Sequence, residues 1–177
     1  MTKTKWHLDP AHSEIGFKVK HMMITNVSGS FGKFDVTAET DGDDFSTAVI
    51  GFAADVNTLS TGNADRDTHL KSADFFDASS HPHLTFKTTK YEKKDDENYV
   101  LSGDLTIRDV TRPVKLNVEF GGIGKDPWGN QRAGFTITGK INRTDFNLNW
   151  NTALETGGVL VGEEVKLFGE LELVKQA

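Results

Sequence analysis

The sequence predicts an all-β fold of eight antiparallel strands, with a short helical insertion between the third and the fourth. Apolar and polar residues alternate with a period of two in eight segments, as in strands that have one buried and one solvated face. The turns between most of these segments are short and rich in Gly, Asp, Asn and Pro. Short connections join antiparallel neighbours, because a parallel return needs a crossover of about a dozen residues. The strands should therefore form a meander.

The alternation is clearest in the last segment, residues 163–174 (EEVKLFGELELV). There, one parity is apolar or glycine and the other is mostly charged. The predicted inward residues of the eight strands are, in chain order, Ile15, Phe17 and Val19; Phe34, Val36 and Ala38; Ile50, Phe52, Ala54 and Val56; Leu84 and Phe86; Tyr99, Leu101, Leu105 and Ile107; Val114, Leu116, Val118 and Phe120; Ala133, Phe135, Ile137 and Ile141; and Val165, Leu167, Gly169, Leu171 and Leu173.

Two segments interrupt this pattern. In residues 60–80, Asn63 is placed to cap a short helix that runs through Lys71, with Asp65 and Asp67 in its first turn. We expect this insertion to act as a lid or side plug on the sheet. The second segment, residues 21–29 (HMMITNVSG), is too short for a stable independent helix, and we interpret it as irregular.

Composition restricts the function classes. The chain has 177 residues, 36% of them hydrophobic, which predicts a single domain over residues 1–177 with a sizeable core. The 20 basic and 26 acidic residues give a net charge of −6, so no basic stripe for nucleic acid is expected. Cysteine is absent, which excludes disulfides and thiolate chemistry.

The N-terminal residues lack the apolar run of a secretory signal, and no stretch approaches about 18 consecutive apolar residues. These two observations predict a cytoplasmic protein without a membrane span.

An eight-stranded sheet with one apolar face can form a two-sheet sandwich or a closed barrel. Closure removes the exposed edges, and the interior of such a barrel is either filled by side chains or holds one slender ligand. Gly103, Gly139 and Gly169 occupy inward positions in mid-strand, where a packed core would carry larger residues. They are expected to kink the strands, to leave a channel, or to do both.

Histidines are the first candidates for polar chemistry. His81 and His83 share one face of a strand, but a metal site needs a third and a fourth ligand. His12 or His21 could supply them only if the fold brings them close. Ordinary surface histidines are the favoured interpretation, and no metal site is predicted. His21 continues the inward parity of its strand, so it lies either at the rim in a hydrogen bond to backbone or at the mouth of an apolar tunnel.

Arginine is scarce, and three arginines have an aspartate one or two residues away. The pairs are Arg66 with Asp67, Arg108 with Asp109, and Arg143 with Asp145. We expect these arginines and aspartates to form ion pairs that hold loops at the barrel corners. Alternatively, one of the arginines recognises a polar or phosphorylated head group.

Catalytic signatures are weak. Ser13 lies near His12 in the sequence, but no nucleophile elbow or other supporting motif accompanies it. No catalytic residue is predicted.

If the interior holds a ligand, the inward residues and the adaptable methionines after the first strand must line it. Such a ligand would be long, apolar and nearly uncharged. The predicted ligand-binding residues are Phe17, Val19, His21, Met22, Met23, Phe34, Phe52, Phe86, Leu105, Phe120, Phe135, Ile137, Gly139, Leu167 and Gly169.

Four blocks in the same order resemble the YceI family of bacterial polyisoprenoid-binding proteins. They are residues 6–34 (WHLDPAHSEIGFKVKHMMITNVSGSFGKF), 66–86 (RDTHLKSADFFDASSHPHLTF), 105–116 (LTIRDVTRPVKL) and 141–148 (INRTDFNL). The resemblance implies a lipocalin-like, extended antiparallel barrel whose tunnel holds a polyprenyl chain, and often a homodimer. It carries over no catalytic residue and no cofactor besides the bound lipid. Members are often exported to the periplasm, whereas this chain shows no signal peptide.

The leading hypothesis is therefore a carrier or scavenger of an isoprenoid or fatty lipid, with a stress-related role. The main alternative is an enzyme that acts on a lipid-like substrate, with His21, His12 or an Arg–Asp pair at the tunnel mouth. A third is a structural module with a packed interior.

Overall fold

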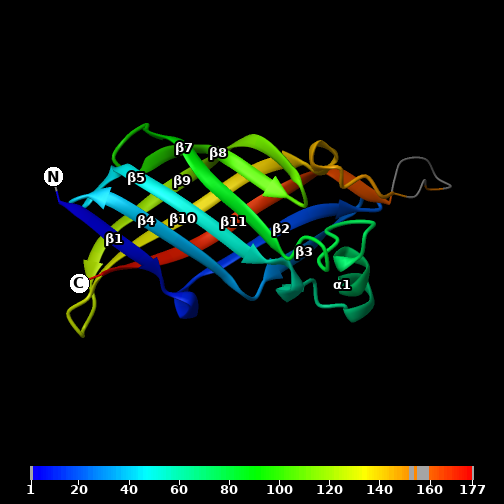
Figure 1. Cartoon of the computed structure of the whole chain (residues 1–177), viewed down its shortest axis with the longest axis horizontal. Helices are drawn as coiled ribbons and strands as arrows, with labels where there is room; N and C mark the ends of the chain where they lie inside the picture. Colours follow the sequence, from blue (N-terminus) through cyan, green and yellow to red (C-terminus); the bar gives the residue numbers. More distant parts are fainter. Residues whose placement is uncertain (1, 152–153, 155–159, 177) are drawn as a thin grey trace.

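The computed structural model describes residues 2–151, 154 and 160–176. Almost all of them belong to strands or to tight connections between strands (Figure 1). The elements are β1 (Lys3–Leu8), β2 (Glu14–His21), β3 (Thr25–Phe31), β4 (Phe34–Asp41), β5 (Asp44–Asp55), β6 (Leu59–Ser60), α1 (Ala64–Lys71), β7 (His83–Lys93), β8 (Asn98–Ile107), β9 (Val110–Lys125), β10 (Gln131–Asn142) and β11 (Val161–Lys175), with 3-10 turns η1 (Pro10–His12), η2 (Val56–Thr58) and η3 (Arg143–Phe146).

The sheet closes into a barrel through β11. One edge of β11 pairs with β10, and the other pairs first with β2 and then with β1. Three barrel strands are each made of two consecutive segments separated by a short turn: β1 with β2, β3 with β4, and β5 with β6. Together with β7 to β11, they give eight strands around the interior. All neighbours are antiparallel, and the predicted eight-stranded meander barrel is confirmed.

One segment was predicted wrongly. Residues 21–29 were interpreted as irregular, but from Thr25 onward they belong to β3, which pairs with β2. Their inward alternation is hidden because Gly29 takes the position of a core residue opposite Phe17. A Cβ on Gly29 would stand 2.4 Å from the Phe17 ring, so this ring fills the space of the missing side chain.

The helical insertion is confirmed with its predicted cap. The Asn63 side chain accepts a hydrogen bond from the backbone N–H of Arg66 at 3.0 Å, and α1 begins at the next residue, Ala64. Asp67 in the first turn accepts hydrogen bonds from the backbone and hydroxyl of Thr61, which ties the helix to the end of β6. Figure 1 shows α1 at one end of the barrel and both chain termini at the other.

Aromatic rings fill the end of the barrel near the termini. Phe45 is 2% exposed, and its ring centroid lies 4.8 Å from that of Trp6, 5.4 Å from that of Phe120 and 5.0 Å from that of Phe135. The Trp6 indole donates a hydrogen bond to the buried Thr40 hydroxyl at 3.0 Å, which satisfies its one polar atom. We call this end the aromatic plug.

Among the described residues, no helix has the length and apolarity needed to cross a membrane.

Candidate functional site

The interior is hollow between the aromatic plug and α1. An outer chamber of about 400 Å³ lies at the α1 end, and an inner chamber of about 140 Å³ lies deeper in the barrel. The outer volume falls within the range typical of small-molecule sites. Six residues line both chambers, which places them end to end: Phe17, Phe31, Leu84, Ile107, Ile141 and Leu167.

The inner chamber is wholly apolar, because every residue that lines it is aliphatic, aromatic or glycine. Phe52 and Phe86 form part of one wall, and Ile137 and Gly169 form part of another. A polar ligand group would find no hydrogen-bond partner among these side chains, and burying such a group without a partner costs about 2–7 kcal/mol. The inner chamber is therefore suited to hydrocarbon.

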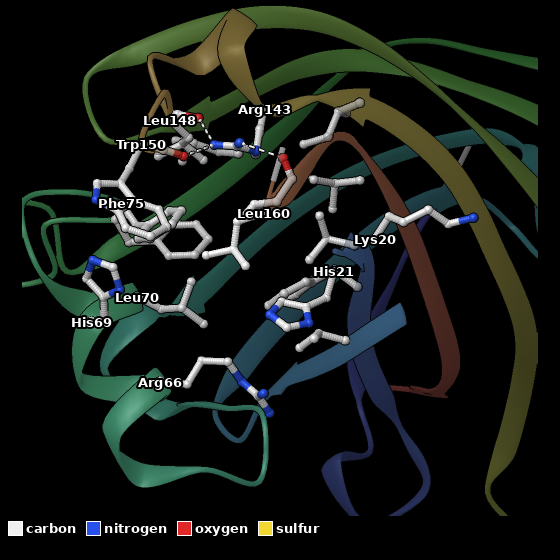
Figure 2. Close-up of a pocket in the computed structure, with 18 of the residues that line it drawn as sticks. Lys20, His21, Arg66, His69, Leu70, Phe75, Arg143, Leu148, Trp150 and Leu160 are labelled. Atoms are coloured by element: carbon white, nitrogen blue, oxygen red, sulfur yellow. Dashed lines mark hydrogen bonds between the residues drawn. The ribbon is translucent and has the colours of Figure 1, made fainter. Parts of the chain in front are cut away.

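Of the two chambers, the outer one carries the polar side chains, and the exposed Lys20 lies at its mouth (Figure 2). The exposed Asp65 also lines this chamber. The Arg66 guanidinium donates to the Thr61 hydroxyl at 2.7 Å and to the Thr61 carbonyl at 2.8 Å. The half-buried His21 also lines this chamber, and its imidazole makes no hydrogen bond to any residue that the structure describes. His21 is thus placed at the mouth of an apolar cavity.

His69 belongs to the same rim but is held by its surroundings. Its Nε2 lies 2.9 Å from a carboxylate oxygen of Asp74, and its ring meets Phe75 and Trp150 edge to face, with centroids 5.1 and 4.6 Å away. These contacts join α1 to the segment after η3. Together they form a wall of the chamber that no strand supplies.

Arg143 fixes the rest of that wall from inside. Its side chain is 4% exposed, and its guanidinium donates to the carbonyls of Gly162 (2.8 Å), Leu148 (2.5 Å), Trp150 (3.0 Å) and Val161 (3.2 Å). Burial lowers the pKa of Arg143. A residue that binds four carbonyls on both sides of the η3–β11 connection holds this segment in place against the chamber.

The expected Arg–Asp corner pairs were therefore wrong. Arg143 binds backbone carbonyls, and Arg66 binds Thr61. Arg108 lies 4.0 Å from the carboxylate of Asp77. On α1, the adjacent Arg66 and Asp67 point in different directions, so they do not face each other.

The structure places nine of the predicted ligand-binding residues on the chamber walls. Val19 and His21 line the outer chamber, and Phe17 and Leu167 line both chambers. Their contact with a ligand stays a prediction. The members of this set that line the inner chamber alone are Phe52, Phe86, Leu105, Ile137 and Gly169.

Six predicted residues lie away from both chambers. Phe120 and Phe135 belong to the aromatic plug, and Phe34 packs against Phe52 with a centroid distance of 6.2 Å. Met22 and Met23 are exposed on the β2–β3 turn. The last of the six is Gly139, which borders a groove on the outer surface.

Two of the three mid-strand glycines, Gly103 and Gly139, do not create the hollow, whereas Gly169 lines the inner chamber. A Cβ on Gly103 would stand 2.4 Å from the Phe86 ring, and one on Gly139 would stand 2.5 Å from a methyl group of Leu116. Neighbouring side chains already fill these spaces. The larger chamber instead arises where α1 and the segment after η3 replace strands as the wall, with Leu70, Phe75, Phe76, Leu148 and Trp150 as lining residues that the strand pattern missed. These residues could have been predicted from the sequence as apolar side chains in segments that lack the strand alternation.

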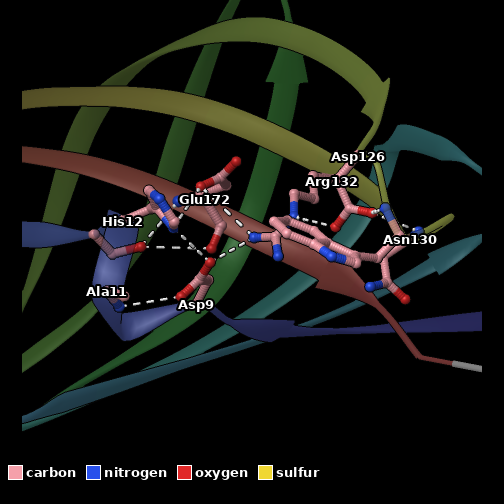
Figure 3. A network of polar contacts seen from close by, with 9 residues as sticks. Asp9, Ala11, His12, Asp126, Asn130, Arg132 and Glu172 are labelled. Carbon is pink, nitrogen blue, oxygen red and sulfur yellow. Dashed lines mark hydrogen bonds and ion pairs between the residues drawn. The ribbon is translucent and has the colours of Figure 1, made fainter.

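One cluster outside the barrel has the composition of a metal site. Potential ligand atoms of Asp9, His12 and Glu172 lie within 4.8 Å of one another (Figure 3). However, Arg132 donates to Asp9 at 2.5 Å and lies 3.7 Å from Glu172, so a positive charge already pairs with both carboxylates of the cluster. Neither His81 nor His83 belongs to such a group among the described residues.

Ser13 and His12 are not paired as a nucleophile and base. The Ser13 hydroxyl exchanges hydrogen bonds with the backbone of Glu172, and the His12 ring faces Asp9 at 2.8 Å. Both residues therefore act in joining η1 to β11.

Comparison with known proteins gives consistent relatives. The model of the YceI-like domain family matches residues 6–173. A UPF0312 protein of Staphylococcus aureus is 43% identical over 170 residues, covering 96% of each chain. The crystal structure of a Campylobacter jejuni YceI protein is 34% identical, with a TM-score of 0.77 over 96% of this chain and 97% of that one. A polyisoprenoid binding domain from Saccharophagus degradans, described as implicated in plant cell wall breakdown, shares the fold at 14% identity, with a TM-score of 0.68 over 97% and 98% of the two chains.

Proposed function

Because the chain belongs to the YceI-like domain family, we propose that it binds a polyisoprenoid or a similar long-chain lipid in the two-chamber cavity. The observation that carries this proposal is the inner chamber, whose lining side chains are all apolar. The structural neighbour described as a polyisoprenoid binding domain supports the same ligand class. A carrier or scavenger is the corresponding role, and homodimerisation and a stress-related role stay predictions.

The lipid tail is assigned to the inner chamber and the head group to the mouth. Burial of apolar ligand surface contributes roughly 25 cal/mol per Å², from which the cost of immobilising a flexible chain is subtracted. The polar rim favours a head group that accepts hydrogen bonds, such as a hydroxyl or a phosphate, because donors and cations outnumber the one carboxylate. The rim consists of Lys20, His21, Arg66 and His69, with Asp65 as the acid.

The proposal is tested by filling the chamber. Val165 lines the outer chamber, so the Val165→Trp variant should occupy volume that the lipid needs. The matched control is Glu164→Trp, which places the same ring on the exposed face of the same strand. We expect native mass spectrometry to show one bound solanesol on the parent chain and on the control, and at least tenfold weaker binding to Val165→Trp.

The circular dichroism spectrum shows whether each variant keeps the β fold. Unchanged solanesol uptake by folded Val165→Trp would exclude the chamber as the site. Absence of both co-purifying lipid and solanesol uptake in the parent chain would favour a packed structural module. Comparison with palmitic acid separates an isoprenoid preference from general lipid binding.

An enzyme acting on a lipid-like substrate is the competing function, and the His69–Asp74 pair on the rim is the observation that favours it. A positioned imidazole beside a carboxylate can serve as a general base. The bound lipid should leave the protein with its mass unchanged after prolonged incubation. A product that appears with the parent chain and not with His69→Ala would establish the enzyme instead.

A further inference from the structure

Four lysines form a row across the outer face of the barrel. Lys166 on β11 pairs directly with Lys140 on β10 and with Lys18 on β2. Lys115 on β9 precedes Leu116, which pairs with Gly139 next to Lys140, and all four lysines border one surface groove. All four are exposed. We call them the lysine row.

This arrangement is unfavourable in isolation. Like charges directly opposite one another on neighbouring strands repel and destabilise the sheet. Within the part of the chain that the structure describes, no carboxylate forms an ion pair with any lysine of the row, although the whole chain carries a net charge of −6. The nearest acid along β11 toward the chamber mouth is Glu164, and the Glu14–Glu170 pair lies four residues the other way. A multivalent anionic partner would relieve this repulsion.

The row leads along β2 to an exposed apolar tip. Met22, Met23 and Ile24 form the β2–β3 turn, and they are 44%, 58% and 76% exposed. Met22 and Met23 both have a positive φ, of 53° and 65°, in a two-strand turn where Asn and Gly are the favoured residues. The turn therefore exposes apolar side chains in a backbone conformation that does not suit them. The preceding residues, Lys20 and His21, line the mouth of the outer chamber.

We propose that the chain docks on membranes that contain anionic lipids, with the Met22–Ile24 tip inserted at the interface and the lysine row against the lipid head groups. This orientation turns the chamber mouth toward the bilayer. The proposal rests on the lipid-binding function above, since docking would give a lipid a path from the bilayer into the chamber. A nucleic acid or an acidic protein fits less well. Either could pair with the lysine row, but neither would explain the exposed apolar tip beside the mouth.

The spacing of the two features agrees with an interfacial position. Four residues separate Lys18 from Met22, which is about 13 Å along a strand. With strands inclined about 40° to the barrel axis, Lys18 stands roughly 10 Å behind the tip. An apolar element that enters the interface by about 5–10 Å would bring the Lys18 side chain to the level of the lipid phosphates. Lysines at an anionic surface each raise the affinity about fivefold.

The test is co-sedimentation with vesicles that contain no polyprenol. We expect binding to phosphatidylcholine vesicles with a quarter phosphatidylglycerol, weaker binding as salt is raised, and little binding to pure phosphatidylcholine. Replacing Lys18, Lys115, Lys140 and Lys166 by Gln should weaken binding at least tenfold. The matched control replaces Lys5, Lys90, Lys94 and Lys125 by Gln, which changes the net charge equally on other exposed positions, and it should bind at least five times more tightly than the row variant.

The tip is tested with a variant that should not destabilise the fold. The double variant Met22→Asn and Met23→Gly suits the turn better, so it should be at least as stable as the parent chain and still bind vesicles at least fivefold more weakly. Equal vesicle binding by the parent chain and both the row and tip variants would overturn docking, as would tighter binding to an oligonucleotide than to the anionic vesicles. Solanesol uptake from solution is measured in parallel: loss of docking with intact uptake overturns this inference alone, and docking without uptake overturns the proposed function alone.

Discussion

The two ends of the barrel differ although the same strands build both. Near the termini, the rings of Trp6, Phe45, Phe120 and Phe135 pack against one another, with centroid distances of 4.8–5.4 Å. Near α1, the strands enclose a chamber of about 400 Å³ whose wall is completed by the helix and by the segment after η3. Strand alternation thus decides which side chains face inward, whereas side-chain size and the irregular segments decide whether the interior is filled.

This difference assigns separate tasks to the two ends. The aromatic plug stabilises the fold, because its closely packed rings make many contacts that are individually weak but add up. The α1 end gives up such contacts and gains a cavity. Substitutions at one end should therefore affect the free energy of unfolding, and substitutions at the other should affect lipid binding.

The largest expected effect comes from the aromatic plug. Phe45→Ala removes a ring that contacts three other aromatic side chains, and it should lower the free energy of unfolding by about 3–5 kcal/mol in urea denaturation. Solanesol binding at a temperature where the variant is folded should stay within twofold of the parent chain. The counterpart is Phe76→Ala on the outer chamber, with a loss of roughly 1–2 kcal/mol and weaker solanesol binding. Equal effects of the two substitutions on both measurements would contradict the division of tasks.

A smaller effect is expected at Gly103, between the two ends. A Cβ there would stand 2.3 Å from the Lys87 carbonyl oxygen and 2.4 Å from the Phe86 ring, so Gly103→Ala should cost about 1–3 kcal/mol of unfolding free energy. The control is Gly124→Ala on β9, where a Cβ meets no atom within 4 Å, and its effect should stay within about 0.5 kcal/mol. A neutral Gly103→Ala would mean that open space does lie beside this glycine.

The sequence was sufficient to predict most of the elements, although not β1, β3 and β6, and it did not show how the interior is divided. Period-two alternation located eight strands, and the Asn63 cap located α1, because both signals are local. Alternation shows which residues face inward without showing their height along the barrel axis. Phe86 and Phe120 have the same inward parity, yet Phe86 lines the inner chamber and Phe120 belongs to the plug.

The remaining misses have the same origin in long-range packing. Gly29 lies under the ring of Phe17, and only that contact explains a glycine on the inward side of β3. Likewise, Trp150 lines the outer chamber because Arg143 binds its carbonyl from the far side of the turn. Both contacts join residues from different segments, so the periodicity within a strand or a helix does not predict them.

The smallest expected effect is a pH dependence that belongs to the outside of the plug end. Arg132 bridges Asp9 on one side and Asp126 on the other, with Nε 2.8 Å from the Asp126 carboxylate (Figure 3). These hydrogen bonds lower the pKa of Asp126 to about 2, and those from His12 and Arg132 lower the pKa of Asp9. In the unfolded chain both carboxyls titrate near pH 4. Their folded pKa values lie lower, so their contribution to stability is fully present above about pH 4 and is lost as the pH falls toward 2.

Arg132→Met should therefore lower stability at pH 7 and flatten the fall in unfolding free energy between pH 4 and pH 2, measured by urea denaturation across that range. Arg112→Met is the control, because the Arg112 side chain is exposed and forms no ion pair with a described residue. It should keep the slope of the parent chain. If Arg132→Met keeps that slope as well, the acid sensitivity arises elsewhere on the barrel, and the plug end owes its stability to its aromatic interior alone.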